Sequence, residues 1–365
     1  MGRCKLCNAI STSISGELSL CLNCIRKNPA RAIPLAMEVH RESRRQFGLP
    51  EHPPKSPDGI SCRLCVNECI IGEGELGYCG LRRNVKGRLT GVTTMAGKLS
   101  WYHDPLPTNC VADWVCPGGT GSGYPVYAHC RGPEYGFNNL AVFFHAYSFN
   151  CLYCQNWHFR EETLMPETRS VEELVSAINS RTSCICYFGG DPAPQLPFAI
   201  NASRLAIKEN RGRILRICFE TNGSMNRGLL KAMIDLSLQS GGCIKFDLKA
   251  WDENLHIALA GVTNKRTLEN FKEASGYIHL RPEPPLLIAS TLMVPGYIDE
   301  KEIREIARFI ASLNPEIPYS LLAFYPHFYM KDLPLLKKED AWSFLRIAQE
   351  QGLKNVRLGN LYLLL

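Results

Sequence analysis

The chain has 365 residues and 17 cysteines, and many of these cysteines stand in closely spaced groups. The first group is Cys4-x2-Cys7-x13-Cys21-x2-Cys24. Two close pairs, each able to bend around one ion, are typical of a tetrahedral four-thiolate zinc site. Because such a site has no open coordination position, we expect its zinc to stabilise a small module that has little core of its own.

A second group, Cys62-x2-Cys65-x3-Cys69-x9-Cys79, places four more thiols within a short stretch of chain. Four thiolates again make a closed metal site. A zinc ion and an auxiliary iron–sulfur cluster both fit this spacing, which does not separate them. The sequence therefore predicts a metal at these cysteines, with a structural role preferred.

The third group is the pair Cys151-x2-Cys154. Together with His158 it has the spacing of a zinc ligand set, but that set lacks a fourth ligand. Several other cysteines stand singly on predicted strands, and for these we expect ordinary buried thiols. They are Cys184, Cys186, Cys218 and Cys243.

Composition favours metal binding over disulfide formation at the grouped cysteines. Hydrophobic residues make up 45% of the chain, as in ordinary globular proteins, and the formal net charge of +6 is spread along it. No apolar run approaches the length of a membrane span, and the N-terminus lacks the apolar core of a signal peptide. We therefore expect a cytoplasmic protein without membrane contact, in a reducing compartment where thiols stay reduced.

From about residue 138 onwards, short apolar strands alternate with amphipathic helices, which is the pattern of repeated βα units. Six units without a second sheet predict an α/β fold, a partial (β/α)6 barrel preceded by small cysteine-rich metal-binding segments. A doubly wound sheet is the alternative. Strands are predicted near 140–146, 184–188, 214–220, 243–249, 287–294, 319–324 and 355–358. Helices are predicted near 170–180, 195–209, 227–239, 264–274, 300–313 and 339–351.

Two of the predicted strands alternate charged and apolar residues. One carries Arg216 and Glu220 on a single face, and the other carries Lys245 and Asp247. Strands of a purely structural parallel sheet are usually apolar on both faces. The charged faces therefore predict a polar ligand inside the barrel, with an internal ion-pair network as the alternative.

The chain divides into four predicted segments. Residues 1–28 form a zinc-ribbon-like segment, and residues 29–59 form a helical and Pro-rich linker. Residues 60–137 carry the second cysteine group and connecting loops. Residues 138–365 form the barrel, whose ligand site we expect at the C-terminal ends of the strands.

The third cysteine group, Cys151-Leu152-Tyr153-Cys154-Gln155-Asn156, resembles the cluster loop of the radical S-adenosylmethionine (radical SAM) superfamily. The usual pattern of that family is Cys-x3-Cys-x-aromatic-Cys. More narrowly, the loop resembles the branch that contains the pyruvate formate-lyase activating enzyme and its uncharacterised relatives. The upstream segment 62–84 is also typical of those relatives, and the resemblance covers roughly residues 60–360.

This resemblance implies a [4Fe–4S] cluster and S-adenosylmethionine as cofactors. An electron from the cluster then cleaves the sulfonium and yields a 5′-deoxyadenosyl radical that abstracts hydrogen, the chemistry of a radical SAM-type oxidoreductase. It implies Cys151 and Cys154 as cluster ligands and Tyr153 as a packing partner of the adenine. No catalytic acid, base or nucleophile is assigned. The strand-end residues that match the family's cofactor site are Gly189, Gly190, Asp191, Glu220, Thr221, Asn222, Asp247 and Lys249.

The sequence departs from the family at one position. The pattern places its first cysteine four residues before Cys151, and that residue is Tyr147. Tyr147 binds iron as a phenolate in one reading, and we count it among the metal ligands. In the other readings His145 replaces the thiolate, Cys130 loops back to supply it, or the chain has lost its cluster and kept the fold.

Two functions therefore stay open. The preferred one is a radical SAM enzyme, activase-like, with a partner protein such as a glycyl radical enzyme as its substrate and a separate electron donor. The alternative is a metal-stapled scaffold without the catalytic cluster. Nucleic-acid binding by the basic stretch 26–45 is disfavoured because no aromatic residue is interleaved with it. The resemblance also implies that residues 84–137 shape the approach to the cluster.

Overall fold

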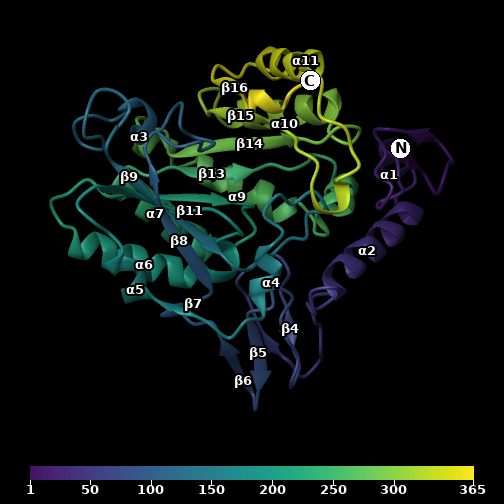
Figure 1. The fold of residues 1–365 in the computed structure, drawn as a ribbon, viewed down its shortest axis with the longest axis horizontal. Helices are drawn as coiled ribbons and strands as arrows, with labels where there is room; N and C mark the ends of the chain where they lie inside the picture. The colour runs from purple at the N-terminus through teal and green to yellow at the C-terminus, as the bar shows by residue number, and fades with distance from the viewer.

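The computed structural model describes residues 1–365, and its centre is one eight-stranded sheet (Figure 1). The strand order is β16-β15-β14-β13-β12-β11-β9-β8. All neighbours pair in parallel except β8, which pairs antiparallel with β9 at the edge. The strands are β8 (Leu99–Pro105), β9 (Asn138–Phe144), β11 (Thr182–Tyr187), β12 (Arg216–Thr221), β13 (Ile244–Asp247), β14 (Leu287–Met293), β15 (Tyr319–Ala323) and β16 (Val356–Gly359).

The sequential strand order makes this sheet a partial barrel. Each parallel strand lies beside the next one along the chain, so right-handed crossovers place all connecting helices on the same face. Successive helices pack beside one another around that face. The partial barrel is confirmed, and the doubly wound alternative is wrong because it needs a reversal of strand order. The helices are α4 (Phe159–Thr163), α5 (Val171–Ser176), α6 (Leu196–Glu209), α7 (Arg227–Ser240), α8 (Glu253–Ala260), α9 (Lys265–Ser275), α10 (Glu300–Leu313) and α11 (Lys338–Glu350).

The predicted strands and helices of the barrel match the observed ones to within a few residues, but the short helix α4 was missed, and so was α8. Its sequence carries both end signals: the Asp252 side chain accepts a hydrogen bond from Leu255 N, and Gly261 ends the helix with φ +74°. The helix is short and largely buried, so its apolar residues show little helical periodicity. Strand β8 was also missed.

The inner face of the barrel is filled at its N-terminal end by the segment that follows β8. Glu134 of this segment is buried and pairs with the buried Arg216, with 2.6 Å between Oε2 and Nη2. Trp114 donates its ring N–H to Ser320 Oγ over 3.2 Å. At this end of the barrel the charged strand faces therefore form an internal ion pair, which was the alternative to a polar ligand. None of residues 84–137 lines the pocket at the other end, although Cys110 donates to the pocket residue Glu220 over 3.4 Å.

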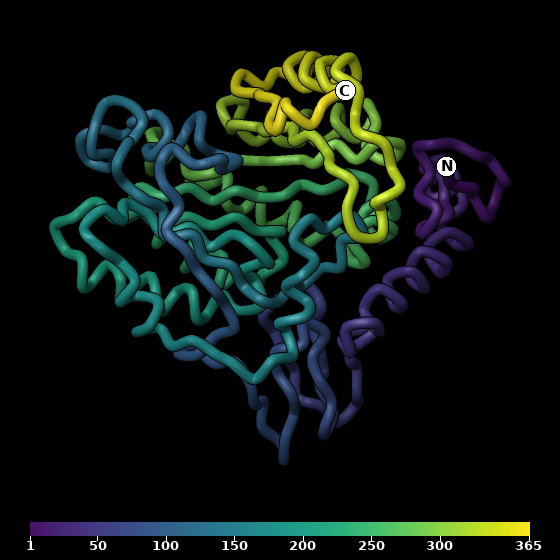
Figure 2. The backbone as a smooth tube through the Cα atoms, in the orientation of Figure 1, coloured from purple at the N-terminus to yellow at the C-terminus, as the bar shows by residue number.

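The first 45 residues lie along one side of the barrel (Figure 2). The cysteine-rich turn at the N-terminus docks on the barrel through Arg26, which contacts Asp299 at 2.6 Å and Glu302 at 2.7 Å. From there a long helix, α2, runs past α8 and packs against it. The elements here are β1 (Gly2–Arg3), β2 (Ile10–Ser11), α1 (Leu22–Lys27) and α2 (Pro29–Arg45).

Three of the four arginines of α2 are held by contacts within the fold. Arg41 pairs with Glu38, and Arg45 contacts Glu51 at 2.8 Å. Arg44 is buried, and its guanidinium lies over the ring of Tyr78 and donates to the carbonyl of that residue. These contacts, rather than a free basic face, account for much of the charge in this stretch.

The second cysteine group lies in a segment of short hairpins beside the barrel (Figure 1). It is joined to the barrel by backbone hydrogen bonds from Val66 N to Ser224 O and from Asn226 N to Leu64 O, each of 2.9 Å. No helix of the chain has both the length and the apolar character needed to span a membrane. The remaining elements are β3 (Ile60–Ser61), β4 (Ile70–Ile71), β5 (Arg82–Val85), β6 (Arg88–Gly91), β7 (Ala96–Gly97), α3 (Pro117–Thr120) and β10 (Arg169–Ser170).

Candidate functional site

A pocket opens at the C-terminal ends of the parallel strands, where the fold predicts a ligand site. Its walls come from the cysteine loop after β9 and from the ends of β11 to β15. Every residue expected at the third cysteine group and at the cofactor site lines it. They are Tyr147, Cys151, Tyr153, Cys154, Gly189, Gly190, Asp191, Glu220, Thr221, Asn222, Asp247 and Lys249.

The glycine turn after β11 is required by the packing of the chain against itself. A Cβ at Gly189 would come within 1.6 Å of the ring of Phe143. Gly190 has φ +64°, and a Cβ there would lie 2.0 Å from the carbonyl oxygen of Phe144. Only glycine permits this conformation and this approach to β9. The turn therefore fixes one wall of the pocket before any ligand is considered.

Asp191 joins three walls of the pocket. Its carboxylate accepts hydrogen bonds from Thr221 Oγ1 at 2.9 Å, from the backbone N–H groups of Asn222 and Ala193 at 3.0 Å, and from Ser148 Oγ at 3.3 Å. Burial raises the pKa of Asp191 to about 6, and the four donors oppose that shift. Because its oxygens are engaged by the protein, Asp191 acts here as a positioning residue.

Two lysine–carboxylate pairs lie at and beneath the pocket. Lys249 contacts Asp247 at 2.9 Å, and Lys245 contacts Glu220 at 2.7 Å. Ser290 donates to Asp247 over 2.9 Å. Burial opposes the charged form of Lys249, but Asp247 together with Tyr147, Cys151 and Tyr153 outweighs burial and holds the pKa of Lys249 well above its usual value. The pocket therefore offers one ammonium group and two carboxylates to a zwitterionic ligand.

The cysteine loop is held from outside by α2 and by the C-terminal end of α8. The Asn150 side chain donates to Ser43 Oγ over 2.7 Å and to His40 Nδ1 over 3.1 Å. The backbone N–H groups of Asn150 and Leu152 donate to the carbonyls of Ala260 and Leu259 over 2.8 and 3.0 Å. These bonds fix the loop on both sides of Cys151.

Tyr147 stands where the family pattern has its first cysteine, four residues before Cys151, and its side chain lines the pocket. Its side chain is 9% exposed and lies among the pocket residues with Cys151 and Cys154. Burial raises the pKa of the Tyr147 phenol well above its usual value, and Lys249 opposes that shift. The phenol is therefore neutral in the chain itself, and a metal ion is required to ionise it.

The two other suggested substitutes do not reach the pocket. Cys130 donates to the carbonyls of Gly132 and Pro133, in the segment that fills the opposite end of the barrel. His145 contacts Glu162 at 3.0 Å and Ser100 Oγ at 3.1 Å and lines a different depression. The readings in which Cys130 or His145 replaces the thiolate are wrong. The prediction for His145 assumed that strand alternation continues as far as Tyr147. Strand β9 ends at Phe144, so that alternation does not apply to His145.

Several polar and apolar residues of the pocket were not predicted, and neither was Ser148 behind its wall. The polar ones that line the pocket are Gln155, Asn156 and Ser290. Ser148 is buried and links Asp191 to Asn222 Nδ2, which donates to it over 2.8 Å. Single serines on a loop or in an apolar strand give no periodic signal. The apolar residues that line the pocket without having been predicted are Phe159, Phe188, Leu292 and Leu322.

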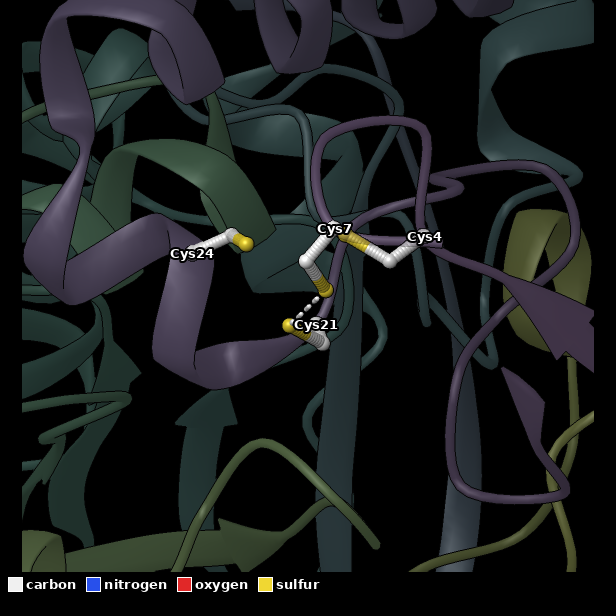
Figure 3. Close-up of side chains that lie close together, drawn as sticks. All are labelled: Cys4, Cys7, Cys21 and Cys24. Atoms are coloured by element: carbon white, nitrogen blue, oxygen red, sulfur yellow. Dashed lines mark hydrogen bonds between the residues drawn. The ribbon is translucent and has the colours of Figure 1, made fainter. Parts of the chain in front are cut away.

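The first cysteine group forms a compact cluster (Figure 3). The sulfur atoms of Cys4, Cys7, Cys21 and Cys24 all lie within 4.8 Å of one another, and those of Cys7 and Cys21 are 3.7 Å apart. Zn–S bonds of about 2.3 Å in a tetrahedron require sulfurs roughly 3.8 Å apart. The four side chains come from two turns and face a common centre, which suits one metal ion.

The second cysteine group is arranged differently. Cys62, Cys65, Cys69 and Cys79 line one small cavity, yet no three of their sulfurs lie within 4.8 Å of one another. Asn67 Nδ2 is 3.8 Å from Cys65 Sγ and donates to Ser148 O over 2.6 Å. The cavity therefore lies next to the cysteine loop of the barrel.

Comparison with known proteins agrees with this geometry. Residues 148–310, which include the cysteine loop and the glycine turn, match the family described as the radical SAM superfamily. Residues 148–310 therefore form a radical SAM domain. A domain of this family implies a [4Fe–4S] cluster and S-adenosylmethionine, and it supports an enzyme. Cys151, Cys154 and Tyr147 all line the pocket, and they are the residues that would hold such a cluster there.

The radical SAM relatives include activating enzymes. An uncharacterized protein of Methanocaldococcus jannaschii is 26% identical over 82% of this chain and 81% of that protein. The isethionate sulfite-lyase activating enzyme of Desulfovibrio desulfuricans is 32% identical, over 40% of this chain and 45% of the enzyme. The pyruvate formate-lyase 1-activating enzyme of Escherichia coli is 27% identical, over 44% of this chain and 63% of the enzyme. The matches therefore span less than two thirds of either activating enzyme.

Proposed function

We propose that this chain is a radical SAM oxidoreductase that cleaves S-adenosylmethionine and abstracts a hydrogen atom from its substrate. The observation that carries the proposal is the convergence in one pocket of Cys151, Cys154 and Tyr147 with the glycine turn and with the charged groups of Lys249, Asp247 and Glu220. When bound, a [4Fe–4S] cluster supplies the electron that splits the sulfonium. Cys151, Cys154 and Tyr147 hold it by two thiolates and a phenolate.

The remaining pocket residues bind and orient the cofactor. The backbone of Gly189 and Gly190 receives the methionine amino group. Lys249 offsets the methionine carboxylate, and Asp247, which shares that lysine, is available to the ribose hydroxyls. Tyr153 packs against the adenine. Apolar side chains that line the pocket, such as Leu292 and Leu322, exclude water from the reacting centre.

The substrate class that we propose is a glycine backbone of a partner protein. The relatives in Desulfovibrio desulfuricans and Escherichia coli are named as activating enzymes. Their similarity to this chain spans 45% and 63% of the two enzymes, and it is this partial similarity that supports an activase-like reaction. An electron donor completes the system.

The test is formation of 5′-deoxyadenosine. The full chain is purified without oxygen, reconstituted with ferrous ion and sulfide, reduced with dithionite and supplied with S-adenosylmethionine. We expect 5′-deoxyadenosine and methionine from the natural chain. Cys154→Ala removes a ligand and is expected to abolish the product, and Tyr147→Phe is expected to reduce it at least tenfold. Cys130→Ala is the matched control, because that thiol lies outside the pocket.

Tyr147→Cys separates the proposal from the scaffold alternative. If the natural chain forms no 5′-deoxyadenosine and the Tyr147→Cys variant does, the chain is a radical SAM scaffold that has lost its cluster. If both chains form it, Tyr147 serves as a ligand in the natural protein. Iron content and circular dichroism, measured on each variant, show whether a loss of product follows from a loss of cluster or of fold.

A further inference from the structure

We propose that Ser100, His145 and Glu162 form a second catalytic site, in which the serine attacks small carboxylic esters. The three side chains line one depression, which shares none of its lining residues with the barrel pocket. The inference therefore does not depend on the reaction proposed above. It rests on the hydrogen bonds between the three side chains, on the contacts that fix them and on the open edge of strand β8.

The three side chains are linked in the order carboxylate, imidazole and hydroxyl. Glu162 Oε2 lies 3.0 Å from His145 Nδ1, and Ser100 Oγ lies 3.1 Å from His145 Nε2. Because a carboxylate accepts hydrogen bonds, Nδ1 donates to Glu162, and the lone pair of Nε2 is left to accept from the serine hydroxyl. In this arrangement a histidine takes the proton of a serine that attacks a carbonyl group.

Lys98 fixes the elements that carry the three side chains. Its backbone carbonyl accepts a hydrogen bond from the N–H of His145 over 2.9 Å. Its ammonium group donates to the carbonyl of Thr163 over 2.7 Å and to that of Met165. Gln195 in turn binds the backbone N–H and carbonyl of Lys98 over 2.8 and 2.9 Å. The start of β8, the residue after β9 and the end of α4 are therefore joined, as a preorganised site requires.

The open edge of the sheet supplies a donor for the negative charge that develops on the substrate. Strand β8 is the last strand of the sheet, and Ser100 pairs with Phe143 of β9. The carbonyl of Lys98 faces β9, and the backbone groups of successive residues point to opposite sides of an antiparallel strand. The N–H of Trp101 therefore points to the open edge. The N–H of the residue after a nucleophilic serine can stabilise the oxyanion.

The lining of the depression indicates the class of ester. Its volume is about 430 Å³, which accommodates a small molecule. Ser100 is exposed within it, whereas the side chain of His145 is 16% exposed. Leu99, Trp101 and Met165 give it apolar walls beside the serine. The site therefore takes esters of short apolar carboxylic acids.

The reaction that this arrangement supports is ester hydrolysis by way of an acyl-serine. Ser100 Oγ bonds to the carbonyl carbon while its proton passes to His145 Nε2, and the N–H of Trp101 binds the oxyanion. The carbon–oxygen bond to the alcohol then breaks, and the alcohol leaves with the proton from His145. Water gives a proton to His145 and attacks the acyl group. The bond to Ser100 breaks, Oγ recovers the proton, and the carboxylic acid is released.

The test is covalent labelling of Ser100. The full chain, purified without oxygen, is incubated with an alkyl fluorophosphonate, which phosphonylates an activated serine and releases fluoride. We expect a single adduct, which mass spectrometry places on Ser100. Ser100→Ala is expected to carry none, and His145→Gln to be labelled about a hundredfold more slowly. Ser312→Ala, at an exposed serine of α10, is the matched control and is expected to be labelled like the natural chain.

Glu162 is tested as the residue that positions the imidazole. Glu162→Gln keeps the shape of the side chain and removes its charge, and we expect labelling about tenfold slower than in the natural chain. Glu162→Asp is expected to recover part of that rate, which a purely structural role would not produce. Glu161→Gln, in the same helix, is the control with an unchanged rate. Hydrolysis of p-nitrophenyl butyrate by these variants is expected to follow the same order.

Two outcomes overturn the inference. The first is a natural chain that carries no adduct under conditions in which a serine esterase, treated in parallel, is fully labelled. The second is labelling that is equally fast in His145→Gln or that persists in Ser100→Ala. If circular dichroism shows that His145→Gln does not fold, Ser100→Ala and the Glu162 variants decide. Formation of 5′-deoxyadenosine is expected to be unchanged in Ser100→Ala, so failure of the reaction proposed for the barrel pocket is seen separately.

Discussion

The side-chain amide of Asn150 donates a hydrogen bond to Nδ1 of His40, with 3.1 Å between the two nitrogens. This bond joins helix α2, which lies outside the barrel, to the residue that precedes Cys151. His40 Nε2 lies 3.1 Å from the carbonyl of Ile257 and donates to it, which fixes the neutral tautomer. A segment expected to be a linker therefore holds the cysteine loop in place.

Removing Asn150 should destabilise the chain. In Asn150→Ala, His40 Nδ1 and Ser43 Oγ lose a donor, and Arg160 loses its acceptor, all in a buried site. We expect a loss of about 2–3 kcal/mol in the free energy of unfolding, measured with urea. Asn156→Ala on the exposed part of the same loop is the control, with a change below about 0.5 kcal/mol. If Asn150→Ala lowers the free energy of unfolding by no more than Asn156→Ala does, the hydrogen bonds between α2 and the loop do not stabilise the protein.

Acid should destabilise the protein through two buried histidines. Burial lowers the pKa of both His40 and His256 to about 4. In the unfolded chain a histidine has a pKa of about 6.5, so below that pH the unfolded state binds protons that the folded state does not. Stability is therefore full above about pH 6.5 and falls toward pH 4, by about 2 kcal/mol per histidine at pH 5.

The measurement compares urea unfolding at pH 7.5 and pH 5.0. His40→Gln should be less stable than the natural chain at pH 7.5 but should lose less stability between the two pH values. His52→Gln, at an exposed position, should show the full loss. Release of metal in acid affects all three chains alike and cancels in the comparison. An unchanged pH dependence in His40→Gln would contradict the assignment of a neutral buried ring.

The ion pair inside the barrel should be sensitive to the loss of one partner. Glu134→Ala leaves Arg216 buried without its carboxylate, although Arg216 still donates to Tyr127 O over 2.8 Å. We expect a loss of about 3–5 kcal/mol in unfolding free energy. Asp235→Ala removes one member of the exposed pair with Lys231 and should cost less than about 1 kcal/mol. A small effect of Glu134→Ala would mean that water enters the N-terminal end of the barrel.

The spacing of local signals determined most of the fold and most of the pocket. Buried strands and amphipathic helices each have a period of their own, so the βα units were predicted to within a few residues. The roles of Gly189, Gly190, Glu220 and Asp247 came from the resemblance to the radical SAM family, and these residues meet in one pocket because parallel strands end at one edge. The compact zinc-type group from Cys4 to Cys24 also follows from spacing alone.

Contacts between distant segments were decided only by the tertiary structure. Nothing near Cys130 or His145 in the sequence shows that one faces the opposite end of the barrel and the other a separate depression. The separation of the four thiols between Cys62 and Cys79 is likewise set by how two hairpins fold onto the barrel. Periodicity reports which face of an element is buried, whereas the partner on that face depends on packing across the whole chain. Spacing therefore grouped Cys4 to Cys24 correctly and the family resemblance identified Cys151 and Cys154, but neither showed whether Cys130 or His145 reaches the pocket.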